Sequence, residues 1–162
     1  MNPPLNPGDY RFDEPPRFEK VIPLLKIKAH DHATVVLVSS KPQGFYGHWN
    51  KGKTQLCTAH KGECQYCEEE LPRRWNGFLH VLDANYRASS FLEVTLLGRD
   101  TLKDLLAEQE SWVGRLVHVS RSKNNVKSPL VFSFVSSGTP GKKLPKEADV
   151  FPTLKRVWRC FG

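Results

Sequence analysis

The pattern of apolar and polar residues along the chain predicts a protein built mainly from β-strands. Successive side chains of a strand point to opposite faces, so alternation is typical of a half-buried strand and a short β-branched run of a buried one. Residues 33–39 form such a β-branched run, whereas residues 90–97 place alternate side chains on two faces. The predicted strands are residues 24–29, 33–39, 45–49, 73–82, 90–97, 116–121 and 130–135.

A single helix is predicted before the last two strands. Thr101 and Asp104 have the spacing of a capping box, and Gly114 lies where the helix would end. Apolar residues at helical spacing follow the cap, namely Leu102, Leu105 and Leu106. About five of these seven segments, with one short helix before the last two, match the order found in the oligonucleotide-binding (OB) fold. We therefore predict a mainly β domain with a five-stranded OB-fold-like barrel, one short helix and a zinc-binding loop insert.

Composition divides the chain into three parts. Residues 1–20 contain five of the 12 prolines, which break helices and cannot donate to a sheet, so a disordered proline-rich arm is predicted there. Residues 21–136 form the predicted OB-like domain, with the zinc loop at 48–72. Residues 137–162 form a basic C-terminal tail that contains a short amphipathic stretch, Phe151–Trp158.

Positive charge is concentrated in the last third of the chain. Residues 115–162 contain ten lysines and arginines against two acids, a net charge of +8, whereas the whole chain carries +7. This asymmetry favours a polyanionic partner, nucleic acid before membrane, because no amphipathic lipid-binding helix accompanies the charge. No apolar run approaches the roughly 20 residues of a membrane-spanning helix, so no membrane partner is expected.

Three cysteines within eleven residues are the strongest chemical signal in the sequence. Cys64 and Cys67 have the Cys-x2-Cys spacing that lets two sulfurs of one turn bind a single ion, and Cys57 supplies a third ligand. Thiolate and imidazole are ligands that Zn²⁺ prefers, and a structural zinc site closes with four of them. A histidine must supply the fourth ligand, and geometry alone leaves His48 and His60 as equal candidates.

Other uses of these cysteines are less favoured. A disulfide would leave one of the three cysteines over, and a redox Cys-x2-Cys pair is not expected to have a third cysteine nearby. A catalytic zinc would keep an open position, and the residues after His60 do not match the His-x-Glu pattern of zinc deaminases. Because cysteines are sparse and no signal-peptide pattern is present, we expect a reducing compartment, the cytoplasm.

Aromatic and basic residues gather on both sides of the zinc loop. Binding of a single strand requires cations that follow the phosphates and aromatic rings on which bases stack, and each stack contributes about 1–3 kcal/mol. Basic residues also occupy the predicted final hairpin. The candidate nucleic-acid contacts are Lys41, Tyr46, Trp49, Lys51, Lys53, Arg73, Arg74, Trp75, Arg121, Lys123 and Lys127.

The sequence from His48-Trp49 through the three cysteines to Arg74-Trp75-Asn76-Gly77 resembles a known zinc-containing OB domain. This domain belongs to the helix-destabilising, single-stranded-DNA-binding protein of T-even phages, and small bacterial and phage-borne proteins share the pattern. The resemblance covers about residues 40–100. It implies one structural zinc bound by His48, Cys57, Cys64 and Cys67, and thereby favours His48 over His60. It also implies a bacterial or phage-infected cell.

Two functions follow as hypotheses. The first is non-enzymatic, sequence-tolerant binding of single-stranded nucleic acid, DNA before RNA, by a basic groove and aromatic stacking around a structural zinc. The alternative is a zinc-stabilised protein-interaction module of a DNA-processing or ribonucleoprotein complex, in which the zinc loop and the C-terminal tail bind a protein partner.

Overall fold

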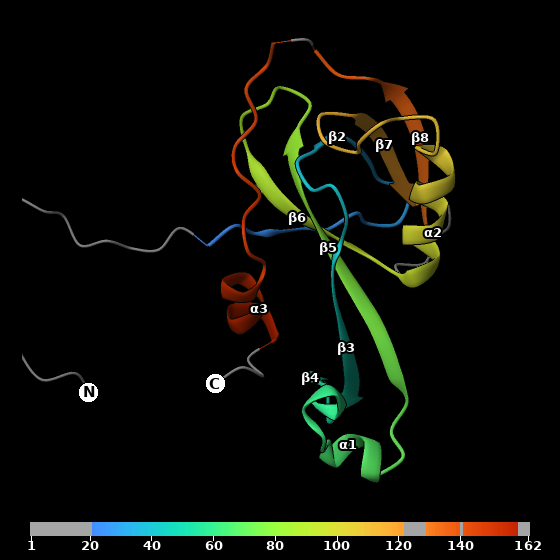
Figure 1. The fold of residues 1–162 in the computed structure, drawn as a ribbon, viewed down its shortest axis with the longest axis vertical. Helices are drawn as coiled ribbons and strands as arrows, with labels where there is room; N and C mark the ends of the chain where they lie inside the picture. The colour runs from blue at the N-terminus through green and yellow to red at the C-terminus, as the bar shows by residue number, and fades with distance from the viewer. Residues whose placement is uncertain (1–20, 122–128, 140, 159–162) are drawn as a thin grey trace, which may run out of the picture.

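Eight strands form one open mixed sheet in the computed structural model, which describes residues 21–121, 129–139 and 141–158 (Figure 1). The order of neighbouring strands is β1 (Leu24–Leu25), β6 (Ser89–Val94), β5 (Arg73–Asp83), β2 (His32–Leu37), β7 (Leu116–Arg121) and β8 (Leu130–Ser136). Only the β1–β6 pair is parallel among these described strands. β3 (Gln43–Asn50) pairs with β5 and with β4 (Lys53–Leu56).

The structure confirms the mainly β architecture, but the described strands form an open mixed sheet of eight strands and do not show the predicted five-stranded OB-fold-like barrel. Within the described residues, β8 pairs only with β7 and β1 only with β6, so the two ends of the sheet are not joined. β5 is eleven residues long and changes partners along its length. Its first half pairs with β3, and its second half pairs with β6 and β2.

The main core lies on one side of this sheet, beneath α2 (Leu96–Leu105). Leu102 of α2 is fully buried among strand residues such as Leu37, Leu79 and Val117. Thr95 caps the helix, and its Oγ1 accepts a hydrogen bond from the Gly98 amide at 3.1 Å.

The capping box predicted from Thr101 is therefore wrong. Thr101 lies inside α2, and its hydroxyl donates to the Leu97 carbonyl at 2.9 Å. The strand predicted to run to residue 97 ends at Val94, because the Thr95 side chain satisfies a free amide of the first turn and starts the helix there.

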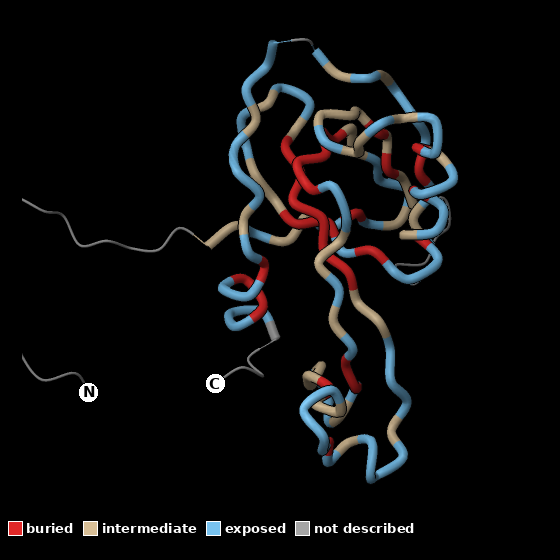
Figure 2. Tube along the Cα trace, in the orientation of Figure 1, coloured by how far each residue is buried: buried red, intermediate tan, exposed pale blue. Residues whose placement is uncertain are grey.

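The region treated as a tail contains a helix that packs on the body. α3 (Phe151–Trp158) covers the opposite side of the sheet, where Leu154 is buried against Phe78 and Phe91 (Figure 2). The segment before α3 is also hydrogen-bonded, because the Ala148 amide donates to His80 Nδ1 at 3.1 Å. The described part of the chain thus has more helical structure than the single helix predicted, including the short elements η2 (Ala59–Lys61) and α1 (Gln65–Glu68). No helix in the described ranges has the length and apolar character needed to cross a membrane.

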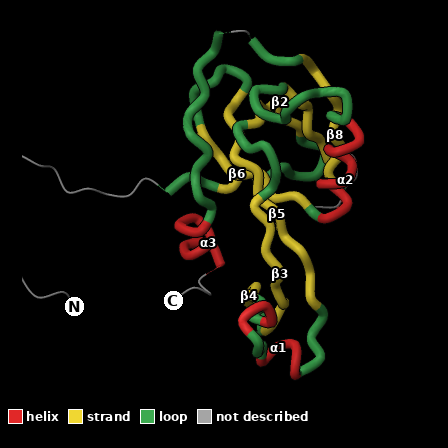
Figure 3. The backbone as a smooth tube through the Cα atoms, in the orientation of Figure 1, coloured by secondary structure: helices red, strands yellow, loops and turns green. Residues whose placement is uncertain are grey.

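A hairpin projects from the sheet and carries the cysteine loop at its end (Figures 1 and 3). We call residues 46–76 the stalk; it comprises most of β3, the start of β5, and β4, η2 and α1 between them. Within these residues the only buried side chains are His48, Cys57 and Cys64. The stalk therefore has no hydrophobic core of its own, and its interior consists of three of the predicted metal ligands.

Candidate metal centre

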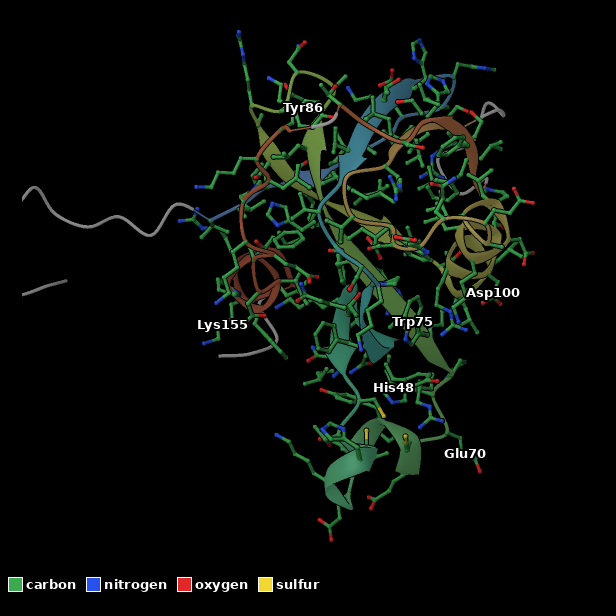
Figure 4. All side chains as sticks on the ribbon, turned by 45° about the horizontal axis from the view of Figure 1, so that its top comes forward. His48, Glu70, Trp75, Tyr86, Asp100 and Lys155 are labelled. Atoms are coloured by element: carbon green, nitrogen blue, oxygen red, sulfur yellow. The ribbon has the colours of Figure 1, made fainter. Side chains whose placement is uncertain are left out.

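The four ligand atoms predicted from the sequence lie together at the end of the stalk (Figure 4). His48 Nε2 lies 3.4 Å from Cys67 Sγ and 3.6 Å from Cys64 Sγ, and the Sγ atoms of Cys57 and Cys67 are 3.6 Å apart. All four atoms lie within 4.8 Å of one another. Zinc bonds of about 2.3 Å to sulfur and 2.0–2.1 Å to nitrogen give tetrahedral edges of about 3.5–3.8 Å. The arrangement can therefore hold one tetrahedral metal ion.

The separation of the sulfurs is inconsistent with a disulfide. A disulfide requires an S–S distance of about 2.05 Å, and the 3.6 Å between Cys57 and Cys67 exceeds it widely. All three cysteines are free thiols. The local structure brings them together in turns, since Cys57 follows β4, Cys64 caps α1 and Cys67 lies within α1.

Backbone carbonyls orient the imidazole of His48. Its Nδ1 lies 3.1 Å from both the Leu71 and the Pro72 carbonyl oxygens, immediately before β5. Only a protonated Nδ1 can donate to a carbonyl, so this contact fixes the tautomer and leaves the Nε2 lone pair directed at the sulfurs. Metal-binding histidines commonly have a carbonyl or carboxylate partner of this kind on the other ring nitrogen.

The three thiols strongly influence one another's ionisation. Burial raises the pKa of the Cys64 thiol, but backbone hydrogen bonds with Thr58 and Cys67 outweigh this effect and lower it to about 6. Burial together with neighbouring Cys57 and Cys64 raises the pKa of Cys67 to about 11. Burial acts to lower the pKa of His48, and its contacts with Cys57 and Cys64 raise it overall. The thiolate of Cys64 therefore forms more readily than that of an ordinary cysteine, and a bound cation would favour ionisation of Cys67 as well.

The structure decides between the two candidate histidines. His48 is fully buried and belongs to the group of potential ligands, whereas His60 is exposed on η2 and lies outside that group. Direct pairing in the β3–β5 ladder places His48 opposite Arg73, so the histidine is anchored by a second strand. His60 instead lines a cavity beside the cluster.

The predicted nucleic-acid contacts on the stalk divide between its two faces. Directly opposed residues of an antiparallel pair share a face, so Tyr46 and Trp75 lie on the same side, together with Arg73. Arg74 pairs with Gly47 and therefore lies on the other side, where it lines a small groove with Trp49. From the sequence we expected these residues on one surface, but the alternation of side chains along each strand places them on two opposite faces.

The Tyr46 face alternates aromatic rings and cations. The guanidinium carbon of Arg73 lies 4.5 Å from the centre of the Tyr46 ring, and that of Arg99 lies 5.2 Å from the Trp75 ring. Tyr46 remains 47% exposed and available for a ligand. Trp75 is half-buried, packs against the main core and lies over a glycine pair, Gly44 and Gly77, where a Cβ would collide with the indole.

The remaining predicted contacts are dispersed. Lys51 and Lys53 are exposed at the turn between β3 and β4, and Lys41 is exposed before β3. Arg121 lies at the end of β7, where its Nε donates to the Ile27 carbonyl at 2.8 Å. Lys123 and Lys127 lie outside the described residues.

Sequence reasoning missed Arg99, because α2 brings it to Trp75 from a distant part of the chain. Arg99 had no local signal in the sequence, since only the tertiary arrangement places it near the stalk. His60 was considered from the sequence only as a possible metal ligand, and the cavity that it lines was not foreseen. Comparison with known proteins gave no matching family model, no matching curated protein and no matching solved structure.

Proposed function

We propose that this chain is a non-enzymatic protein that binds single-stranded nucleic acid, DNA before RNA, with little sequence preference. The observation that carries the proposal is the exposed Tyr46 ring with Arg73 stacked on it, at the base of a projecting stalk. An aromatic ring beside a guanidinium offers a stacking surface for a base and a positive charge for the adjacent phosphate. The lysines of the β3–β4 turn extend this positive charge along the stalk.

We propose zinc as the metal of the cluster. One imidazole and three thiolates form a donor set typical of structural zinc sites, and a four-ligand site leaves no open position for chemistry. When bound, the ion would neutralise the thiolates and join β3, the β4–α1 loop and the start of β5. Thiolate ligands must be reduced, which supports a reducing compartment such as the cytoplasm.

The connectivity of the body supports an OB-like core. β2, β5 and β6 follow one another as an antiparallel meander, α2 comes next, and β7 and β8 form the final hairpin. β2 lies between β5 and β7, so the first strand of this set joins both halves. The five strands and the helix thus follow the predicted chain order, with the stalk inserted between β2 and β5.

Titration of a fluorescent oligodeoxythymidylate tests the proposal. We expect binding at low salt that weakens as salt rises, because phosphate contacts release counterions, and weaker binding of a duplex of equal length. Tyr46→Ala should reduce affinity roughly 5- to 150-fold, the equivalent of one stacked base. Tyr46→Phe keeps the ring and serves as the matched control. Equal affinity for duplex and single strand, or no binding at low salt, contradicts the proposal.

The protein-interaction module remains a second proposal because of β8. This strand lies at one end of the sheet in the described residues and exposes Val131 by 48% and Val135 by 50%. Exposed apolar residues on an edge strand are suited to pairing with a strand of a protein partner. The buried side of α3 is already occupied by the body through Leu154, so only its outer surface is available for a partner. Binding of a protein that survives nuclease treatment and is lost in Val135→Glu would favour this function.

A further inference from the structure

A cavity of about 300 Å³ lies between the stalk strands and the metal loop. Tyr46 of β3 contributes an aromatic ring and Arg73 of β5 a cation, while Phe45 also lines the cavity but packs its ring against Phe151 of α3. Ala59 and His60 of η2 form part of the wall, next to the predicted ligand Cys57. The cavity therefore combines rings, a fixed positive charge and a polar imidazole within one small volume.

We infer that this cavity binds one nucleobase, unstacked from its neighbours in a single strand; this inference rests on the proposed function. Its volume lies at the lower limit of small-molecule pockets, which suits one ring system rather than a whole nucleotide. Proteins that bind single strands commonly take up splayed bases between aromatic and cationic side chains. Tyr46 supplies the aromatic ring, and His60 supplies a nitrogen for the base edge.

Arg73 links the cavity to the backbone of the strand. Its guanidinium carbon lies 4.5 Å from the centre of the Tyr46 ring, and the exposed side chain would meet a phosphate. The base and its phosphate would then contact neighbouring groups, the base inside the cavity and the phosphate at its mouth. His60, which lies outside the group of potential metal ligands, would contact the edge of the base inside the cavity.

The inner wall of the cavity depends on the metal loop. Cys57, Ala59 and His60 come from the segment that the metal cluster folds, whereas the opposite wall comes from β3 and β5. Binding of the base and binding of the metal therefore stabilise the same conformation of the loop, and each should strengthen the other.

Two variants test the cavity directly. Ala59→Phe fills it, and His60→Ala removes its imidazole. We expect each to weaken binding of oligodeoxythymidylate roughly 5-fold or more while the metal content stays that of the parent. The matched controls are Ala107→Phe and His32→Ala, at exposed positions that do not line the cavity, and they should stay within about twofold of the parent.

Photo-crosslinking decides the question without any variant. An oligonucleotide carrying 5-iodouracil should crosslink to Tyr46 or His60 of the parent protein, as mapped by mass spectrometry of the peptides. Crosslinks confined to peptides elsewhere, or unchanged affinity of both cavity variants in a parent that binds strands, overturn the cavity and leave the proposed function standing. A parent that binds no single strand overturns both. Full displacement of the oligonucleotide by low concentrations of free thymidine monophosphate would identify a free nucleotide as the ligand and overturn the inference.

Discussion

Removal of the metal should open the stalk and leave the body of the protein folded. The perturbation is a strong chelator, or the variant His48→Ala, which removes the buried ligand that β3 contributes. The stalk contains no buried side chain besides His48, Cys57 and Cys64 among residues 46–76. The body has a separate core that includes Leu37, Leu79 and Val117.

The expected magnitude follows from this division. Ordering a residue costs roughly 1–2 kcal/mol of backbone entropy, and the stalk has little apolar burial to offset that cost. Structural zinc contributes about 10–16 kcal/mol in small zinc-binding peptides, which exceeds the stability of many whole domains. Without the ion we expect the opening free energy of the stalk to fall by about 4 kcal/mol or more, a factor of about a thousand in amide protection.

Hydrogen exchange measured residue by residue is the assay. The Cys57 amide, which donates to the Tyr46 carbonyl at 2.9 Å, reports on the stalk. The Val38 amide, which donates to the His80 carbonyl at 2.9 Å, reports on the body. Chelation should abolish protection of the first and change that of the second by less than about tenfold. His60→Ala, at an exposed position outside the ligand group, is the matched control and should keep its metal and its protection.

Three results would refute this reasoning. A stalk that stays protected after complete removal of the metal would show that contacts other than the cluster hold it. Loss of protection of both amides at the same chelator concentration would show that stalk and body form one cooperative unit. A metal-free protein as purified from cells, with full protection at Cys57, would remove the basis for a structural metal altogether.

Three further predictions concern the body and the base of the stalk. Leu154→Ala should cost about 2–5 kcal/mol in urea unfolding, because the side chain is fully buried, whereas the exposed Lys155→Ala should cost little. Burial lowers the pKa of His80, an effect that Glu147 opposes. Because the unfolded chain then binds a proton more readily than the folded protein, the free energy of unfolding is highest above about pH 6.5 and falls as the pH drops below that value. Unfolding at pH 8 and pH 5 should show this loss, and His80→Gln should reduce it. Gly77→Ala should displace the Trp75 indole and cost about 1–3 kcal/mol, detected by tryptophan fluorescence and thermal unfolding; an unchanged melting temperature would contradict the packing.

Local patterns in the sequence determined much of the secondary structure and the metal donors. β-branched and alternating runs located β2, β5 and β7, because the period of a strand is recorded directly in neighbouring residues. Cys64 and Cys67 could also be predicted as ligands from the sequence, because both belong to one turn and their spacing is local. The helix start was misplaced because Thr101 and Asp104 have the spacing of a capping box, whereas in the structure Thr95 caps α2 and Thr101 lies inside it.

Tertiary structure decided everything that depends on which distant segments meet. His48 prevailed over His60 because β5 and the carbonyls before it fix the imidazole against the sulfurs. Strand pairing placed Tyr46 opposite Trp75. The described strands form an open sheet with a stalk in place of the expected barrel, because β1 and β8 at its two ends do not pair with each other. A sequence records the chemistry of each residue and its local periodicity. The faces that side chains share across strands depend on register, which forms only when the strands pair.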